Sequence, residues 1–126
     1  MDKDNFKYFG RVIHGAGNGK KFGFPTVNLR LSEDNIQLSK GVYAVEVFIE
    51  NEKKKGMLYV GTRPSLNFSE LTIEIHIFNF SKEIYDREIR FNVLKKIRDE
   101  LVFNSTAELI KQIKKDQDEI IEFFKK

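Results

Sequence analysis

Polar and apolar residues alternate along much of the first hundred positions of this chain. Over residues 72–78, three isoleucines occupy every second position, with Glu74 and His76 between them. Successive side chains of a β-strand point to opposite faces, so this period predicts a strand with one apolar and one polar face. The segments that such patterns predict to be strands are residues 6–14, 26–31, 42–49, 57–60, 72–78 and 88–94.

The end of the chain follows the period of an α-helix instead. Ser105 and Glu108 match a capping box, in which each side chain satisfies a free backbone N–H of the other residue. We therefore expect a helix over residues 105–125. Its apolar positions form one stripe, made of Leu109, Ile110, Ile113, Ile120, Ile121 and Phe124. Upstream, the polar run at residues 50–55 is predicted to be a hairpin connection.

These elements predict a mainly β fold in a single domain, residues 1–126, with the strands over about residues 6–95. The polar turns between the strands are too short for the helices that parallel strands need as crossovers. We therefore expect a small antiparallel barrel that the C-terminal helix plugs or flanks. With 126 residues, the chain is long enough to build one hydrophobic core.

The amino-acid composition excludes several kinds of functional site. The chain has no cysteine, which excludes disulfides, thiolate catalysis and Cys-ligated zinc. Its two histidines, His14 and His76, are too few for a usual His-based metal site. A net charge of +3 with dispersed lysines suits an anionic nucleotide better than nucleic acid. We see no secretory leader and no run of about 20 apolar residues, so we expect a cytoplasmic protein without a membrane partner.

A glycine-rich segment follows the first predicted strand. Gly15, Gly17 and Gly19 alternate with other residues, and Lys20 and Lys21 come directly after them. Glycines let backbone N–H groups approach a ligand closely, and the lysines add positive charge, so the segment suits a phosphate. It is not a Walker A loop, because no Gly-Lys-Ser/Thr follows. A flexible hairpin turn explains the same residues.

The next segment runs from Gly23 through Pro25 to Asn28. Pro25 fixes its own backbone and restricts the residue before it. Thr26 and Asn28 lie two apart, so on an extended chain their side-chain oxygens point to the same side. Hard oxygen ligands of this kind suit Mg²⁺, which takes further ligands from water and nucleotide phosphates. The alternative is a turn in which both side chains bond locally.

Two further charged residues are candidates for catalysis or ligand binding. Glu74, on a strand face opposite the isoleucines, is a candidate general base if it lies inside or at the mouth of the barrel. The alternative for Glu74 and His76 is the solvated face of a sheet. Arg98 lies in the mixed-charge segment 95–103, which we expect to connect the last strand to the helix. Its planar donor fork suits a phosphate or a flavin edge.

Taken in order, these segments resemble the riboflavin kinase family, either free-standing or as the C-terminal part of the bacterial bifunctional flavokinase/FAD synthetase. The similarity extends from about Tyr8 to Asp116. The segments that carry it are His14-Gly15, Gly19-Lys20, Gly23-Phe24-Pro25-Thr26-Val27-Asn28, Gly41 to Val45, the turn motif Gly61-Thr62-Arg63-Pro64-Ser65, Glu74 to Phe80, Ile84-Tyr85, Lys96 to Glu100 with Phe103, Gln112-Ile113 and Asp116.

The resemblance implies a six-stranded antiparallel Greek-key β-barrel, the riboflavin kinase-like split barrel, with a C-terminal α-helix. It also implies transfer of the ATP γ-phosphate to the riboflavin 5′-hydroxyl, giving FMN and ADP, with Mg²⁺ (or Zn²⁺ or Mn²⁺) as the metal. Glu74 is then the base, and Thr26 and Asn28 are the metal ligands. The residues implied in binding are Gly15, Gly17, Gly19, Lys20, Lys21, Gly23, Pro25, Thr26, Asn28, Phe78, Tyr85 and Arg98.

Several positions depart from the family pattern. Lys20 stands where arginine is common, so a two-pronged phosphate contact becomes a point charge. Tyr59 replaces an asparagine that often precedes the Gly-Thr-Arg-Pro motif. Asn79 replaces aspartate and Asp86 replaces glycine, both beside the expected nucleotide pocket. The proposed metal and base positions are intact.

Two rival functions belong to other classes. One is a non-catalytic barrel that binds a flavin or nucleotide without turnover. The other is a basic barrel for single-stranded nucleic acid, which needs exposed aromatic residues among Lys and Arg on one sheet face. The predicted strands place acidic and neutral residues there instead. We expect a monomer that acts on small molecules, with an FAD synthetase domain as its possible neighbour in a longer parent chain.

Overall fold

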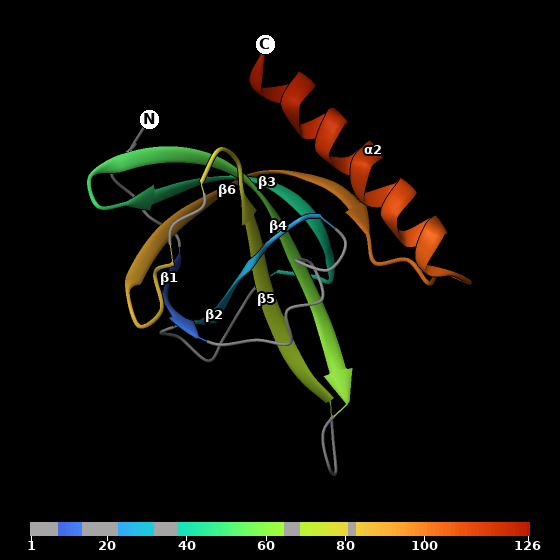
Figure 1. The fold of residues 1–126 in the computed structure, drawn as a ribbon, viewed down its shortest axis with the longest axis horizontal. Helices are drawn as coiled ribbons and strands as arrows, with labels where there is room; N and C mark the ends of the chain where they lie inside the picture. Colours follow the sequence, from blue (N-terminus) through green and yellow to red (C-terminus); the bar gives the residue numbers. More distant parts are fainter. Residues whose placement is uncertain (1–7, 14–22, 32–37, 65–68, 81–82) are drawn as a thin grey trace.

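The protein is described by a computed structural model that covers residues 8–13, 23–31, 38–64, 69–80 and 83–126. Within these residues it forms strands followed by a helix (Figure 1). The elements are β1 (Tyr8–Ile13), β2 (Val27–Leu31), β3 (Gly41–Ile49), β4 (Glu52–Pro64), β5 (Ser69–Ile77), β6 (Glu88–Asp99) and α2 (Thr106–Phe124). Among the described residues, no helix is long and apolar enough to cross a membrane.

The strands close into one antiparallel barrel in the order β1-β2-β5-β4-β3-β6. Strands β3, β4 and β5 follow one another as neighbours, and β6 returns to lie beside β3, which is a Greek key. The predicted six-stranded Greek-key barrel with a C-terminal helix is therefore confirmed. The helix flanks the barrel from outside and does not plug it (Figure 1).

Two predicted connections are present but shorter than expected. The link between β3 and β4 is only the pair Glu50 and Asn51, both at positive φ (50° and 69°), and Ile49 already pairs with Glu52. Two left-handed residues make the tight turn that matches strand twist, so the polar residues after it remain in β4. Residues 95–99 likewise belong to β6, because they pair with β3 up to the contact between Gly41 and Asp99.

Strand β4 also continues through Pro64, so the described part of the Gly61-Thr62-Arg63-Pro64 motif is strand and not turn. These differences share one cause. Charged residues near strand ends keep their backbone in the ladder, and a sequence pattern does not reveal that pairing. The strands are therefore longer than their apolar segments suggest.

The barrel interior is filled by aliphatic side chains together with Phe91 and Tyr43. Phe91, Leu58, Ile75 and Ile89 are fully buried, with Val45 and Val47 also inside. Every second residue of β3 and β5 contributes to this core, as the alternation predicts. The inner face therefore has no room for a ligand, and any chemistry belongs on the outer face.

A second core lies between the outer face of the barrel and α2. Val42, Ala44 and Met57 from β3 and β4 surround Ile120 of the helix, which is 0% exposed. Helix α2 crosses this face along one side of the barrel (Figure 1). The apolar stripe predicted for the helix is thus used to dock it, leaving its other face to solvent.

The helix begins as the sequence predicts. Ser105 caps it, and its hydroxyl accepts from the backbone N–H of Glu108 at 3.1 Å. The Glu108 carboxylate, however, accepts from the backbone N–H of Asn104 at 3.2 Å. The Glu108 side chain therefore bonds the N–H of the residue before Ser105, and not that of Ser105 as in a standard capping box. Two free backbone donors are still satisfied.

The docking of α2 gives a first prediction. Ile120→Ala should lower the free energy of unfolding by about 2–5 kcal/mol, because it leaves a cavity between helix and barrel. Ile121→Ala is the matched control, since Ile121 is 37% exposed and should lose much less. Urea denaturation followed by circular dichroism measures both. Equal losses in the two variants would show that Ile120 does not dock the helix.

Candidate active site

A row of polar side chains crosses the outer face of the barrel at one level. In register, Asn28 of β2 lies opposite Glu74 of β5, and Glu74 lies opposite Tyr59 of β4. The row continues through Val42 to Arg98 of β6. Directly opposed residues of antiparallel strands share a face, so these side chains project to the same side. Strand pairing thus gathers residues that are distant in sequence.

A cleft of about 370 Å³ lies between this row and α2. Its size falls within the range of small-molecule sites. Its apolar lining comes from the barrel, the segment after β6 and the helix: Phe24, Val42, Met57, Leu101, Phe103, Leu109 and Ile113. Its polar lining is Thr26, Tyr59, Glu74, His76, Arg98 and Asp116. Apolar walls with a few convergent polar groups suit a flat ligand with a polar tail.

The segment that enters β2 is tied to β5 by two hydrogen bonds. The Thr26 hydroxyl donates to Oε1 of Glu74 at 3.1 Å. The Pro25 carbonyl accepts from Nδ1 of His76 at 2.7 Å, and Gly23 has a φ of 86° that favours glycine. These contacts hold the Thr26 oxygen beside the Glu74 carboxylate. Two of the predicted site residues, Thr26 and Glu74, therefore lie side by side.

Glu74 is neither inside the barrel nor on a fully solvated face. It is half-buried on the outer face, between the Thr26 hydroxyl and the ring of Tyr59. Its carboxylate reaches the cleft. A half-buried carboxylate next to a cleft can accept a proton from a ligand hydroxyl placed there.

Tyr59 joins the row to the segment after β6. Its hydroxyl donates to Oε2 of Glu100 at 2.9 Å. Burial raises the pKa of Tyr59 to about 12, helped by this hydrogen bond and by the negative charges of Glu100 and Glu74, while Arg98 acts the other way. Tyr59 is therefore a neutral donor at physiological pH.

Arg98 contacts the helix. Its Nε lies 2.9 Å from both oxygens of Asp116, and Nη2 lies 2.8 Å from one of them. Gln112 donates to the same carboxylate at 2.9 Å, and the guanidinium lies over the ring of Phe103 at 5.8 Å. Asp116 is 1% exposed. Arg98 thus forms a wall of the cleft, with its donor fork directed at Asp116.

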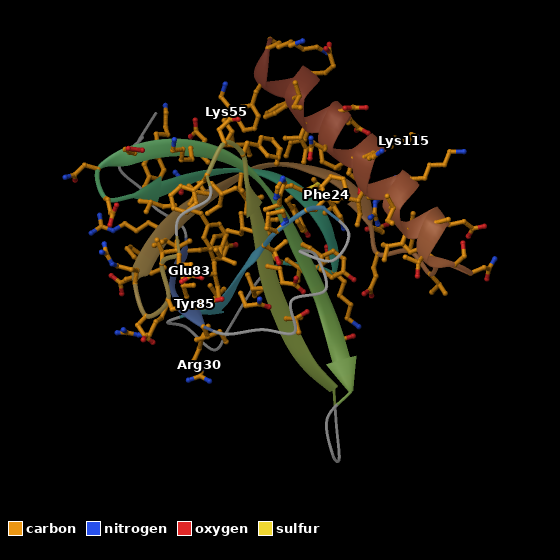
Figure 2. All side chains as sticks on the ribbon, in the orientation of Figure 1. Phe24, Arg30, Lys55, Glu83, Tyr85 and Lys115 are labelled. Atoms are coloured by element: carbon orange, nitrogen blue, oxygen red, sulfur yellow. The ribbon has the colours of Figure 1, made fainter. Side chains whose placement is uncertain are left out.

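Several predicted site residues are not gathered at the cleft. Tyr85 is 46% exposed, and Figure 2 shows it on the opposite side of the barrel from Phe24. Phe78 lies next to the cleft, with its ring in edge contact with His76 at 5.5 Å. Gly15, Gly17, Gly19, Lys20 and Lys21 lie outside the described residues.

Asp116 and Tyr59 are site residues to which sequence reasoning assigned no role. The sequence does indicate a special role for Asp116, because this charged residue occupies an apolar position of the helix stripe, between Ile113 and Ile120. A charge at such a position calls for a buried partner. Tyr59 was visible only as a departure from a family pattern, and its bond to Glu100 depends on strand register.

The described residues hold no group of three or more His, Asp or Glu side chains that could bind a metal ion alone. The hard donors near the cleft are the hydroxyl of Thr26, the amide of Asn28 and the carboxylate of Glu74. Such a set suits a hard cation that receives its remaining ligands from a phosphate chain and water.

An antiparallel barrel with an apolar cleft lined by the carboxylates of Glu74 and the ion-paired Asp116 is typical of a protein that binds small molecules, and Glu74 is its candidate base. Comparison with known proteins specifies the class. The family model for flavokinase, riboflavin kinase, matches residues 3–124. The chain belongs to the riboflavin kinase family.

Known relatives show how much of a longer protein the chain matches. It is 40% identical over 122 residues to the bifunctional riboflavin kinase/FMN adenylyltransferase of Buchnera aphidicola, covering 94% of this chain and 39% of that protein. The chain thus spans about two fifths of the length of that relative.

Two solved structures share the fold. A Streptococcus pneumoniae protein described as a macrolide-efflux protein superposes with a TM-score of 0.81 and 34% identity, over 88% of this chain and 36% of that one. The riboflavin kinase of Trypanosoma brucei superposes with a TM-score of 0.66 and 24% identity, over 94% of this chain and 79% of that one.

The buried ion pair gives a second prediction. Asp116→Ala should destabilise the protein by about 3 kcal/mol, because it leaves the mostly buried Arg98 charge without a partner. Asp118→Ala, at an exposed position two residues along α2, is the control and should change stability little. Urea denaturation compares them. Similar stabilities of the two variants would contradict a structural role for the pair.

Proposed function

We propose that this chain is a riboflavin kinase that transfers the γ-phosphate of ATP to the 5′-hydroxyl of riboflavin, giving FMN and ADP. The observation that carries the proposal is the position of Glu74 at the junction of an apolar cleft and the Thr26–Asn28 donors. Membership of the riboflavin kinase family supports the same reaction. Adenylyl transfer, named in the bifunctional relatives, is not proposed for this chain.

The two halves of the cleft suit the two halves of riboflavin. The apolar wall of Phe103, Leu109 and Ile113 suits the flat isoalloxazine ring. The polar row at Thr26 and Glu74 suits the hydroxylated ribityl chain, because it offers a hydroxyl and a carboxylate. In this orientation the 5′-hydroxyl lies at the Glu74 end.

ATP then approaches from the β2 side of the row. Thr26 and Asn28 supply neutral oxygens, and the Thr26 hydroxyl keeps lone pairs available while its proton points to Glu74. These donors fit Mg²⁺ bound mainly by nucleotide phosphates, and we assign Thr26 and Asn28 to that role. When bound, the ion neutralises charge on the transferring phosphoryl group.

The reaction is an in-line displacement. The riboflavin 5′-oxygen forms a bond to the γ-phosphorus, the bond from that phosphorus to the β–γ bridging oxygen breaks, and ADP leaves. Glu74 takes the proton of the 5′-hydroxyl, and the hydrogen bond from Thr26 orients its carboxylate. Holding the two substrates in line supplies much of the rate increase, because phosphoryl transfer demands positioning more than covalent catalysis.

The direct test is formation of FMN from riboflavin and MgATP, resolved by chromatography. Wild-type protein should form FMN, whereas Glu74→Gln should bind riboflavin but lose about 10²- to 10⁴-fold in kcat, because the amide accepts no proton. Glu122→Gln, exposed on the last turn of α2, is the matched control with unchanged rate.

Three outcomes distinguish the possibilities. No FMN from wild-type protein with Mg²⁺, Zn²⁺ or Mn²⁺ contradicts the kinase. Riboflavin binding without FMN supports the non-catalytic flavin-binding barrel instead. Near-wild-type turnover of Glu74→Gln removes Glu74 as the base and leaves the kinase assignment intact.

Thr26 gives a separate prediction for the metal. Thr26→Val keeps the shape of the side chain but removes its oxygen, so it should raise the Mg²⁺ concentration needed for half-maximal rate by roughly tenfold. Thr26→Ser retains the hydroxyl and should stay near wild type. Titration of the FMN-forming rate with Mg²⁺ measures both. Identical Mg²⁺ dependence in Thr26→Val and wild type would rule out Thr26 as a ligand.

A further inference from the structure

One wall of the cleft is a segment whose backbone makes few hydrogen bonds to the described residues around it. The β6–α2 connection (residues 100–105) contributes Leu101 and Phe103 to the cleft. Over residues 100–103, no backbone hydrogen bond joins the segment to another described residue. Leu101 is 47% and Val102 is 95% exposed. The position of this wall must therefore be fixed by side chains.

Two side-chain contacts join residues 100–103 to the barrel. At its start, Glu100 accepts from the hydroxyl of Tyr59 at 2.9 Å. Further along, Phe103 lies against the guanidinium of Arg98 at 5.8 Å. Arg98 belongs to the strand that leads into the connection, whereas Tyr59 belongs to β4, two strands away in the barrel. Of these two contacts, the bond to Tyr59 is the one that fastens the connection across the barrel.

The sheet leaves space for the ring of Tyr59. A Cβ added at Gly61 would meet only the outer part of that ring, 2.6 Å from Cε2, 2.8 Å from the hydroxyl oxygen and 2.9 Å from Cζ, as its three nearest atoms. The backbone of Gly61 is not at positive φ, so its conformation does not itself require glycine. Glycine at 61 is therefore needed by the tyrosine that lies over it.

Charge also favours this arrangement. Tyr59 lies between two carboxylates, with Glu74 directly opposite on β5 and Glu100 at its hydroxyl, and with Arg98 nearby. The bond to Tyr59 keeps Glu100 at the edge of the cleft. Because Tyr59 is neutral, it can donate to Glu100 without adding a negative charge of its own beside Glu74.

We propose that Tyr59 is a positioning residue that fastens the β6–α2 connection over the cleft and thereby sets the affinity for the flat aromatic part of the substrate. This inference rests on the proposed function, because it assigns the flavin ring to this cleft. Only the fastened connection presents Leu101 and Phe103 as a wall. The apparent dissociation constant of a ligand that needs the wall equals its intrinsic value divided by the fraction of molecules in which the connection is fastened.

The first variant is Tyr59→Phe, which keeps the ring and removes the donor. The dissociation constant and KM for riboflavin should rise roughly tenfold, the scale of a hydrogen bond to a charged acceptor. The kcat and the KM for ATP should stay within about twofold, because the contact serves ground state and transition state equally. Tyr43→Phe is the matched control, since it removes a hydroxyl bonded to Ser39 on the inner side of the barrel.

Gly61→Ala tests the same bond without changing either partner. The added methyl displaces the tyrosine ring, so it should weaken riboflavin binding about as much as Tyr59→Phe. Combined with Tyr59→Phe, it should add little, because the bond is already lost and effects of coupled residues do not add. Binding is measured by quenching of riboflavin fluorescence without ATP, and turnover by FMN formation.

The outcomes separate this inference from the kinase assignment. FMN formation with unchanged riboflavin affinity in Tyr59→Phe and Gly61→Ala overturns the role of Tyr59 alone. A loss of affinity in Tyr43→Phe equal to that in Tyr59→Phe would also overturn it, since any lost hydroxyl would then suffice. If riboflavin binding weakens as expected but the wild-type protein forms no FMN, the positioning role of Tyr59 is supported and the kinase assignment is rejected.

Discussion

The ion pair between Arg98 and Asp116 determines where the C-terminal helix meets the barrel. Asp116 is 1% exposed, and a buried carboxylate without partners is costly. The helix can therefore dock only where the guanidinium of Arg98 reaches this carboxylate, which also accepts from Gln112 one turn earlier in the same helix. Apolar packing around Ile120 supplies attraction but little direction, whereas the charge pair fixes the position along the strand.

The position of the helix creates the site. Once Asp116 meets Arg98, the first half of α2 brings Leu109 and Ile113 over the polar row on the barrel, and the cleft forms between them. Because the described barrel interior is packed with side chains, we place the proposed ligand site in the seam between sheet and helix. The interior can then serve stability alone, while the residues of the seam serve binding and chemistry.

Most of the fold could be predicted from the sequence. The alternation over residues 72–78 predicted β5, and the Ser105 cap predicted the start of α2, because both signals are local. The polar residues after Asn51 and after Lys95 were predicted to be connections, although they pair with β3. Their backbones pair although their side chains are charged, and only the partner strand reveals this pairing.

The site was predictable in part. Thr26 and Glu74 were proposed from motif and face, and the structure brings them within hydrogen-bonding distance. The contacts of Arg98 with Asp116 and of Tyr59 with Glu100 were not predicted, because each joins elements whose relative position depends on barrel closure and helix docking. Sequence patterns specify faces of strands, but they do not specify which side chains meet across separate elements.

The central claim is that the reacting hydroxyl of riboflavin lies at Glu74 in the cleft beneath α2. A crystal structure of the protein with riboflavin and MgADP tests it most directly. We expect the ring against Phe103 and Ile113, with the 5′-oxygen about 2.6–3.2 Å from the Glu74 carboxylate. A flavin bound elsewhere, or one whose 5′-hydroxyl points away from Glu74, would contradict it.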